Sequence, residues 1–589
     1  MKNLSYLYKL ILFFAVFNLS CKKEMLNIKP ASEFSNVDVW GDPALSETFI
    51  NNIYLGIPFG MAIYAGDVDE SRSRQEAGFE IGNSLITPDN ANNWGNWNGS
   101  YSSIRACNIA LTNLVKVTFD DPALKNRMIG EATFLRAWYY FNLTSFYGGV
   151  PLVTKVYGLA DDFLIARSSY ADCIKFISDE CDKAVALLPL AQTQENNGRA
   201  TKGAAMALKS CALLYAASDL HNPAKNSIVS TGYAKPELLG YTSPDATMHW
   251  QAAKDAAKAV IDLGVYSLYK PNPANATEAA KNYEDLFTSR TSVEDIQVRY
   301  FAAAVGQGFN GWEIVPNGWY GNGGVGATNE MAEAYEMADG TKFDRSIPAV
   351  AAQPYDKRDP RFYASILFEG AAYRTRPADL TGVDPLGVMQ VGTWQKWDNA
   401  GGKMVEIYGL DSRNSIANSW NNNTTGTTLL KYLDKNIDIQ KTNQDLTWRY
   451  FRYGEILLNY AEACIELGQD AEARTYINMI RQRAGMPNVT ESGTTLRDRY
   501  RNERRIELAF EGRRFFDVRR WLIADQAYHP LHGVTVLYPL NPDHTTAAIP
   551  RITPVQIQLG AWDNKSYFFP IDRGEALKNI KLLQNPIYK

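Results

Sequence analysis

The stretch from residue 449 to residue 521 constrains the fold of this chain most, because its apolar residues recur at helical spacing. The first apolar run has members three or four positions apart, which places them on one helix face: Tyr453, Ile456, Leu457, Tyr460, Ala461, Cys464 and Leu467. After an interruption at Gly468 and Asp470, a second run follows and ends before Gly485 and Pro487, residues that commonly follow a helix end. Its members are Ala473, Tyr476, Ile477 and Ile480. The pattern predicts two antiparallel helices joined by a short turn.

The second part of this stretch, residues 503–520, combines charges of both signs with apolar side chains. The charged residues are Glu503, Arg504, Arg505, Glu507, Glu511, Arg513, Arg514, Asp517, Arg519 and Arg520. Opposite charges three or four positions apart stabilise a helix, and the apolar residues between them indicate that this helix packs against the protein core. We therefore predict a helix that carries a structural ion-pair network rather than a charged active site. Loss of Glu507 or Arg514 should then harm folding more than binding.

Composition and charge narrow the class of protein. With 589 residues and 46% apolar content, the chain can bury a large core, as two to four domains or as one large assembly. Its net charge of -4 argues against nucleic acid as a partner. Five cysteines besides Cys21 lie in apolar stripes without C-x-x-C spacing, so we predict core thiols rather than disulfides or a zinc site.

The first 20 residues are typical of an export signal. Lys2 and Lys9 flank its start, residues 11–17 are apolar, and Ser20 with Cys21 ends it. The apolar run is too short to span a bilayer permanently. A cysteine after a small residue resembles a bacterial lipobox, although Asn18 stands where an aliphatic residue is usual. We predict lipidation of Cys21, with an ordinary cleaved signal as the alternative.

Helical patterns also cover residues 104–115, 129–147, 170–187, 203–218 and 250–263. Together with the hairpin at 450–484 they predict helix pairs, as in tetratricopeptide-type solenoids, although no strict 34-residue repeat is present. Inserts rich in Gly, Asn and Pro separate the pairs, at 86–100, at 306–327 and at about 370–448. Helix packing does not explain tryptophans in such segments, so these loop aromatics are binding candidates.

The sequence carries no recognised catalytic or metal-binding motif. The five histidines lack metal-ligand spacing, and G-x-S-x-G does not occur. Gly321, Gly323 and Gly326 satisfy G-x-G-x-x-G, but a turn-rich segment precedes them instead of a strand. Carboxylate pairs such as Asp67 and Asp69 could serve acid/base chemistry, but spacing alone does not identify a catalytic pair. We therefore expect neither a metal nor another cofactor.

The main candidate binding residues are Trp94 and Trp97, with Asn93 and neighbouring asparagines around them. A sugar ring presents an apolar C–H face and a rim of hydroxyls, for which an indole and an amide are suitable partners. The alternative is that either indole packs beneath its loop. Further candidates are the loop aromatics Trp312, Trp319 and Tyr320 and the polar residues Asp67, Asp69 and Arg72.

Several segments, in this order, resemble the SusD/RagB family. They are CKKEMLNIKP at 21–30, EATFLRAWYYFNLTSFYGGVPLV at 131–153, KRDPRFYASI at 357–366, RYGEILLNYAEA at 452–463, INMIRQRAGMP at 477–487, ERRIELAFEGRRFFDVRRW at 503–521, FFPIDRGEALKN at 568–579 and LLQNPIY at 582–588. The resemblance implies a mainly α fold, in which tetratricopeptide-like helix pairs form a right-handed solenoid with long loop-rich inserts and a few short β-strands. It also implies a signal peptide at 1–20, an N-terminal helical region at 21–290 with the Trp/Asn loop, and a C-terminal region at 291–589 with the loop insert and the charged helix.

The resemblance further implies non-catalytic binding of an oligosaccharide or polysaccharide nutrient at the cell surface. The protein would be lipid-anchored in the outer membrane, face outward, and deliver its ligand to a SusC-like TonB-dependent transporter. In this family, an aromatic residue before the Y-x-x-I-x-x-x-N helix, here Tyr101, Ile104 and Asn108, commonly stacks on the ligand, and Trp94 and Trp97 lie there. A RagB-like peptide-binding protein is the alternative. An exported glycoside hydrolase is a more remote one.

Overall fold

The computed structural model describes residues 36–58, 66–73, 80–230, 233–417, 424–438 and 442–588, so the predicted export signal and Cys21 lie outside the described residues. The chain is mainly helical, with 43% helix and 12% strand, which confirms the predicted fold class. Across the described ranges, no helix combines the length and the apolar character needed to cross a bilayer.

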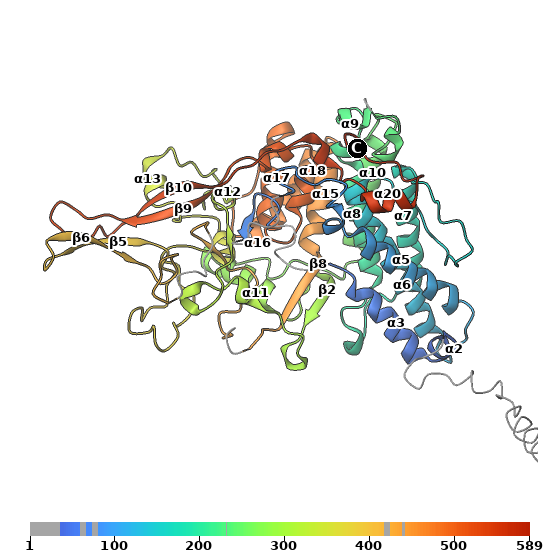
Figure 1. Cartoon of the computed structure of the whole chain (residues 1–589), viewed down its shortest axis with the longest axis horizontal. Helices are drawn as coiled ribbons and strands as arrows, with labels where there is room; N and C mark the ends of the chain where they lie inside the picture. The colour runs from blue at the N-terminus through green and yellow to red at the C-terminus, as the bar shows by residue number, and fades with distance from the viewer. Residues whose placement is uncertain are drawn as a thin grey trace, which may run out of the picture.

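Helices that pack in series form the scaffold (Figure 1). They are α2 (Asn36–Gly41), α3 (Pro43–Leu55), α5 (Trp97–Leu114), α6 (Pro122–Tyr147), α7 (Tyr170–Leu187), α8 (Lys202–Ala217), α10 (Thr247–Asp262), α15 (Tyr453–Glu466) and α16 (Asp470–Arg483). Each helix from α5 to α7 packs against the next long one, α10 packs against both α8 and α15, and α15 packs against α16. The predicted hairpin at 450–484 is therefore present as α15 and α16, and it continues the series that α5 to α10 begin.

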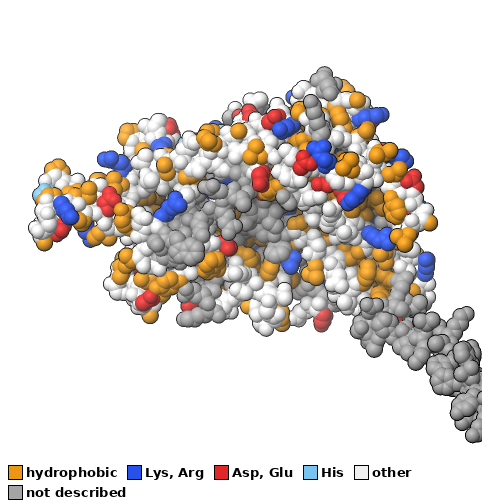
Figure 2. Space-filling model, in the orientation of Figure 1, with side chains coloured by type: hydrophobic (Ala, Val, Ile, Leu, Met, Phe, Trp, Pro, Cys, Tyr) orange, Lys and Arg blue, Asp and Glu red, His pale blue; other side chains and the backbone are white. Residues whose placement is uncertain are grey.

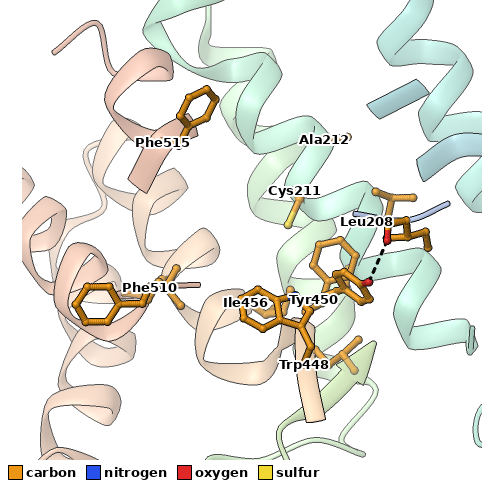
Figure 3. Packing of buried hydrophobic residues seen from close by; sticks show 14 of the residues in the cluster. Leu208, Cys211, Ala212, Trp448, Tyr450, Ile456, Phe510 and Phe515 are labelled. Atoms are coloured by element: carbon orange, nitrogen blue, oxygen red, sulfur yellow. Dashed lines mark hydrogen bonds between the residues drawn. The ribbon is translucent and has the colours of Figure 1, made fainter. Parts of the chain in front are cut away.

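Buried side chains from distant segments meet inside this scaffold. Figure 3 shows Leu208 and Cys211 of α8 beside Ile456 of α15, with Trp448 and Tyr450 of the adjoining strand β8 (Leu446–Arg452). The five described cysteines are buried and free, as predicted for core thiols. The long helix α6 begins where the Asp121 side chain accepts a hydrogen bond from the Ala123 amide (2.8 Å).

The charged segment differs from the sequence prediction in one respect, because it forms two helices, α17 (Gly493–Glu507) and α18 (Arg514–Arg520). Between them Phe510 and Gly512 adopt left-handed backbone, with φ of 62° and 75°. This conformation interrupts a helix. The predicted ion-pair network is confirmed: the buried Glu507 carboxylate contacts the guanidinium groups of Arg361 (3.0 Å), Arg452 (2.7 Å) and Arg483. Burial alone would raise the pKa of Glu507, but these three cations outweigh it and lower the pKa.

The remaining elements are short, apart from the helix α11 (Ala276–Thr288). The other helices are α9 (Ser227–Ser230), α12 (Asn329–Ala334), α13 (Pro348–Ala352), α14 (Pro360–Ser365), α19 (Ala524–Ala527) and α20 (Arg573–Lys578). Three two-stranded sheets pair β1 (Ser71–Ser73) with β3 (Val325–Ala327), β2 (Asp295–Phe301) with β8, and β4 (Ile366–Leu367) with β7 (Thr428–Leu429). On the face shown in Figure 2, positive and negative side chains intermingle and form no large patch of one sign.

A four-stranded sheet forms an arm that projects from the helical body, at the left of Figure 1. Its order is β10 (Arg551–Gln558), β9 (Leu531–Tyr538), β5 (Thr393–Asp398) and β6 (Lys403–Tyr408). The indole of Trp394 stacks on Tyr538 with ring centroids 4.6 Å apart, and Trp397 stacks on His544 at 3.9 Å. Two tryptophans of the 370–448 insert therefore stabilise this arm.

The carboxyl group of Glu369 ties the arm to the body. It accepts hydrogen bonds from the Val391 amide (2.7 Å), the Gly392 amide (2.9 Å) and the Tyr538 hydroxyl (2.9 Å). Burial raises the pKa of Glu369 to about 7, although these hydrogen bonds oppose the shift. The folded protein therefore holds a proton here that the unfolded chain releases near pH 4.5, the ordinary pKa of a glutamate side chain.

This difference predicts a pH-dependent stability. The contribution of Glu369 is complete below pH 4.5 and is lost as the pH rises through 7, by about 3 kcal/mol in all. In Glu369→Gln, the amide mimics the protonated acid at every pH. Thermal unfolding between pH 5 and 8 should therefore show a smaller decline of Tm in the variant than in the wild type. Parallel curves for the two proteins would contradict the assignment.

Candidate ligand-binding site

Three of the predicted aromatic residues, Trp312, Trp319 and Tyr320, line one pocket of about 440 Å³. Two short 3₁₀ turns, Gly311–Glu313 and Asn317–Trp319, carry the two tryptophans, and Tyr320 directly follows the second turn. The opposite wall comes from residues 374–379, with Asp438 nearby. Folding therefore brings the glycine-rich loop at 306–327 against the beginning of the 370–448 insert.

Trp312 and Tyr320 offer the accessible aromatic surface of this pocket. The Trp312 side chain is 37% exposed, and its Nε1 donates a hydrogen bond to the Tyr320 carbonyl (3.1 Å). The Tyr320 hydroxyl donates to the Asp379 carboxylate, and this hydrogen bond raises the pKa of the phenol. The pair presents an apolar indole face beside an oriented carboxylate, which are the two surfaces that a sugar ring requires.

Trp319 belongs to the floor of the pocket, because it is only 4% exposed. Its Nε1 donates to the Arg374 carbonyl (3.1 Å), and the Arg376 guanidinium lies 3.4 Å from its ring centroid. Arg376 in turn forms ion pairs with Asp384 and Asp411, each at 2.7 Å. These contacts fix the floor, so a ligand can meet a preformed surface.

The floor of the pocket packs so closely at Gly318 that no side chain fits there. A side-chain carbon at Gly318 would collide with Arg376 and Asp411, and the Gly318 amide donates to Asp411 Oδ1 (3.0 Å). We expect Gly318→Ala to lower the free energy of unfolding by about 1–3 kcal/mol, because the added methyl group overfills a packed site. Thermal unfolding tests this, with Gly382→Ala as the control, since nothing lies within 4 Å of a carbon added there. Equal Tm values for both variants would contradict the packing argument.

The main sequence candidates, Trp94 and Trp97, do not line the pocket of Trp312. Trp97 begins α5, is 5% exposed, and packs against Tyr101 and Tyr147 with ring centroids 5.0 Å away in each case. Trp94 is half-buried, and its carbonyl accepts a hydrogen bond from the Tyr147 hydroxyl (3.1 Å). Asn93 ends the 3₁₀ turn Ala91–Asn93, and its side chain lies outside the described part. Both indoles thus contribute substantially to packing.

Trp97 nevertheless lines an open groove of about 580 Å³ elsewhere on the scaffold, together with Tyr101. The groove lies between the start of α5, residues 151–165 and α20. Tyr101 and Asn108 fix its wall, because the Tyr101 hydroxyl donates to the Pro151 carbonyl (2.9 Å) and Asn108 donates to the Val153 carbonyl (2.8 Å). These two members of the Y-x-x-I-x-x-x-N pattern thus hold the segment that follows α6.

The acidic candidates Asp67 and Asp69 and the basic candidate Arg72 are buried. Asp69 pairs with Arg505 and Arg514, each at 2.9 Å. Burial would raise the pKa of Asp69, but these two cations outweigh it and lower the pKa to about 2. Burial raises the pKa of Asp67 to about 7, and the Arg72 guanidinium donates to the Gly66 carbonyl. The contacts of all three residues lie inside the protein, and none of them lines the pocket of Trp312.

Sequence reasoning missed the polar wall of the pocket, which comprises Arg374, Thr375, Asp379 and Asp438. Only the tryptophans of the 370–448 insert were candidates, because these four polar residues carry no motif. Among the described residues, no group of three or more His, Cys, Asp or Glu side chains is placed to hold a metal ion.

Comparison with known proteins gives two family matches. The model of the "SusD family" matches residues 291–588, and a second family model, "Starch-binding associating with outer membrane", matches residues 26–214. The SusD-like protein P38 of Formosa agariphila is 24% identical over 573 residues, which cover 92% of this chain and 96% of that protein.

Solved structures are similar over nearly the whole chain. A SusD-like protein from Bacteroides fragilis has a TM-score of 0.72 at 28% identity, with 96% of this chain and 100% of that chain covered. A SusD-like carbohydrate-binding protein from the same species has a TM-score of 0.69 at 25% identity, with 92% and 100% covered.

Proposed function

Because the chain belongs to the SusD family, we propose that it is a non-catalytic cell-surface protein that binds an oligosaccharide or a polysaccharide and delivers it to a SusC-like TonB-dependent transporter. The similar B. fragilis protein described as carbohydrate-binding supports a glycan as the ligand. The family description that names the outer membrane supports that location, with lipidated Cys21 as the anchor.

The observation that carries the glycan proposal is the exposed indole of Trp312 at the mouth of a polar pocket. The C–H face of a sugar would pack on this indole, while its hydroxyls would bond to Asp379, Asp438 and Thr375. The pocket volume of about 440 Å³ lies within the range of small-molecule sites. We therefore assign ligand contact to Trp312 and Tyr320, and support of the site to Trp319.

A panel of soluble glycans and peptides tests this proposal. The mature protein is run through native gels containing starch, laminarin or xylan, and is titrated with oligosaccharides and with short peptides. We expect retardation by at least one glycan and recovery of that glycan with no new reducing ends. Binding of peptides alone would favour the RagB-like alternative, and new reducing ends would favour the glycoside hydrolase.

The delivery step needs a separate test with the full chain in the membranes of its own host. Affinity purification in mild detergent should recover a TonB-dependent transporter together with the protein. Recovery of the protein without any such transporter would contradict delivery while leaving glycan binding untouched.

A further inference from the structure

A second pocket, of about 450 Å³, lies on a different part of the scaffold, between α3, the loop at 195–199, β2 and β8. It shares no lining residue with the pocket of Trp312. Its lining is rich in carboxamides and phenol rings: Asn51, Tyr54, Asn197, Gln297, Tyr300 and Gln307. The family resemblance assigned no role to any of these residues.

An irregularity in strand pairing occurs at this pocket. In the β2–β8 ladder Gln297 lies opposite Phe451 and Val298 lies opposite Arg449, so the intervening Tyr450 has no Cα partner in β2. Both Gln297 and Tyr450 line the pocket. Bulges of this kind redirect side chains and are over-represented beside functional sites.

The Gln297 side chain supports the wall of this pocket. Its Nε2 donates to the Gly198 carbonyl (2.8 Å), which fixes the orientation of the amide. Its Oε1 is buried, and no donor among the described residues lies within hydrogen-bond distance. Gln297 is only 2% exposed, and a buried acceptor without a hydrogen-bond partner is unfavourable. This oxygen is also closed to solvent, so Gln297 serves the pocket by holding the 195–199 loop, and a ligand would contact the exposed carboxamides of the rim instead.

The rim of the pocket supplies the other contacts. Asn51, Asn197 and Gln307 are exposed, and each carboxamide can both donate and accept a hydrogen bond. The nearest cation of the loop, Arg199, is engaged in ion pairs with Glu47 and Glu131, each at 3.0 Å.

Two further charged residues line the pocket, the exposed Glu195 and the half-buried Arg299, whose guanidinium lies 5.2 Å from the Phe301 ring centroid. The three carboxamides of the rim and the Glu195 carboxylate suit a ligand that carries many hydroxyls, and the carboxylate disfavours an acidic sugar.

We infer that this second pocket binds a neutral saccharide unit, as a further contact site for the glycan that Trp312 holds. The inference rests on the proposed function, because it takes the ligand to be a saccharide. Gln307 and Trp312 are five residues apart, so at most about 18 Å separates their Cα atoms. One oligosaccharide chain can span that distance, and longer chains should therefore bind more tightly than short ones.

Hydrogen exchange of the full mature chain tests the inference, with laminarihexaose, maltohexaose and xylohexaose as probes, one for each polysaccharide of the panel above. We expect at least one of them to slow exchange in residues 195–199 and 297–307. The double variant Asn197→Ala/Gln307→Ala should lose this protection and bind that probe about 3- to 10-fold more weakly, with an unchanged Tm because both side chains are exposed. Gln526→Ala, an exposed glutamine that lines neither pocket, is the matched control.

The outcomes separate this inference from the proposed function. Protection of residues 310–321 without protection of 195–199 and 297–307 would overturn the second site and leave the first intact. Protection at 195–199 that persists in the double variant would also overturn it, because the amides would then not contact the ligand. Absence of protection at both pockets with all three probes would contradict both proposals.

Discussion

Replacing Glu507 with alanine is expected to lower the free energy of unfolding by about 3–5 kcal/mol. The buried carboxylate contacts the guanidinium groups of Arg361, Arg452 and Arg483, which come from α14, β8 and α16. Its removal takes a shared counter-charge from three buried cations, and the remaining carboxylates around them cannot replace it at the same position. Because these cations join segments far apart in sequence, the loss should weaken the scaffold as a whole.

Chemical denaturation with urea measures this effect. The matched control is Asp179→Ala, which removes an exposed ion pair with Lys175 (2.7 Å) and should change stability by less than about 1 kcal/mol. A Glu507→Ala protein with wild-type stability but without glycan binding would contradict the structural role. It would return the charged segment to consideration as a ligand site.

Replacing Trp312 with alanine should weaken glycan binding by about 30-fold or more, which corresponds to about 2 kcal/mol for a central aromatic contact. The fold should survive, because the Trp312 side chain is already 37% exposed and packs on the surface of a short turn. The floor formed by Trp319, Arg376 and Asp411 does not depend on it.

Tyr408→Ala is the matched control for this prediction. Tyr408 is also 37% exposed but lies on β6 of the projecting arm, away from the pocket. Isothermal titration with the glycan that binds most tightly should therefore show a large loss for Trp312→Ala and little change for Tyr408→Ala. Equal affinities for both variants would remove Trp312 from the site.

The helical scaffold was largely predictable because amphipathic stripes report directly on buried faces. The predicted helix at 170–187 coincides with α7, whose first turn is capped by the Ser169 hydroxyl accepting from the Asp172 amide (3.0 Å). The start of α6 was predicted seven residues too late, because polar residues in its first turns break the apolar stripe. The interruption between α17 and α18 was also missed, since the left-handed backbone at Phe510 has no counterpart in the charge pattern.

The candidate site was only partly predictable, because its residues come from segments that lie far apart in the sequence. Trp312 and Tyr320 are close in sequence, so a search for loop aromatics found them together. Asp379 and Asp438 reach the same pocket only through the folding of the 370–448 insert, which Arg376 anchors to Asp411. The residues next to Asp379 and Asp438 in the sequence give no indication that these two side chains lie beside Trp312 in the folded chain.

A crystal structure with the glycan that binds most tightly tests the central claim most directly. We predict a sugar ring packed on the exposed face of Trp312, with its hydroxyls bonded to Asp379 or Asp438. A sugar bound only in the groove that Trp97 and Tyr101 line, with the Trp312 pocket empty, would contradict this account.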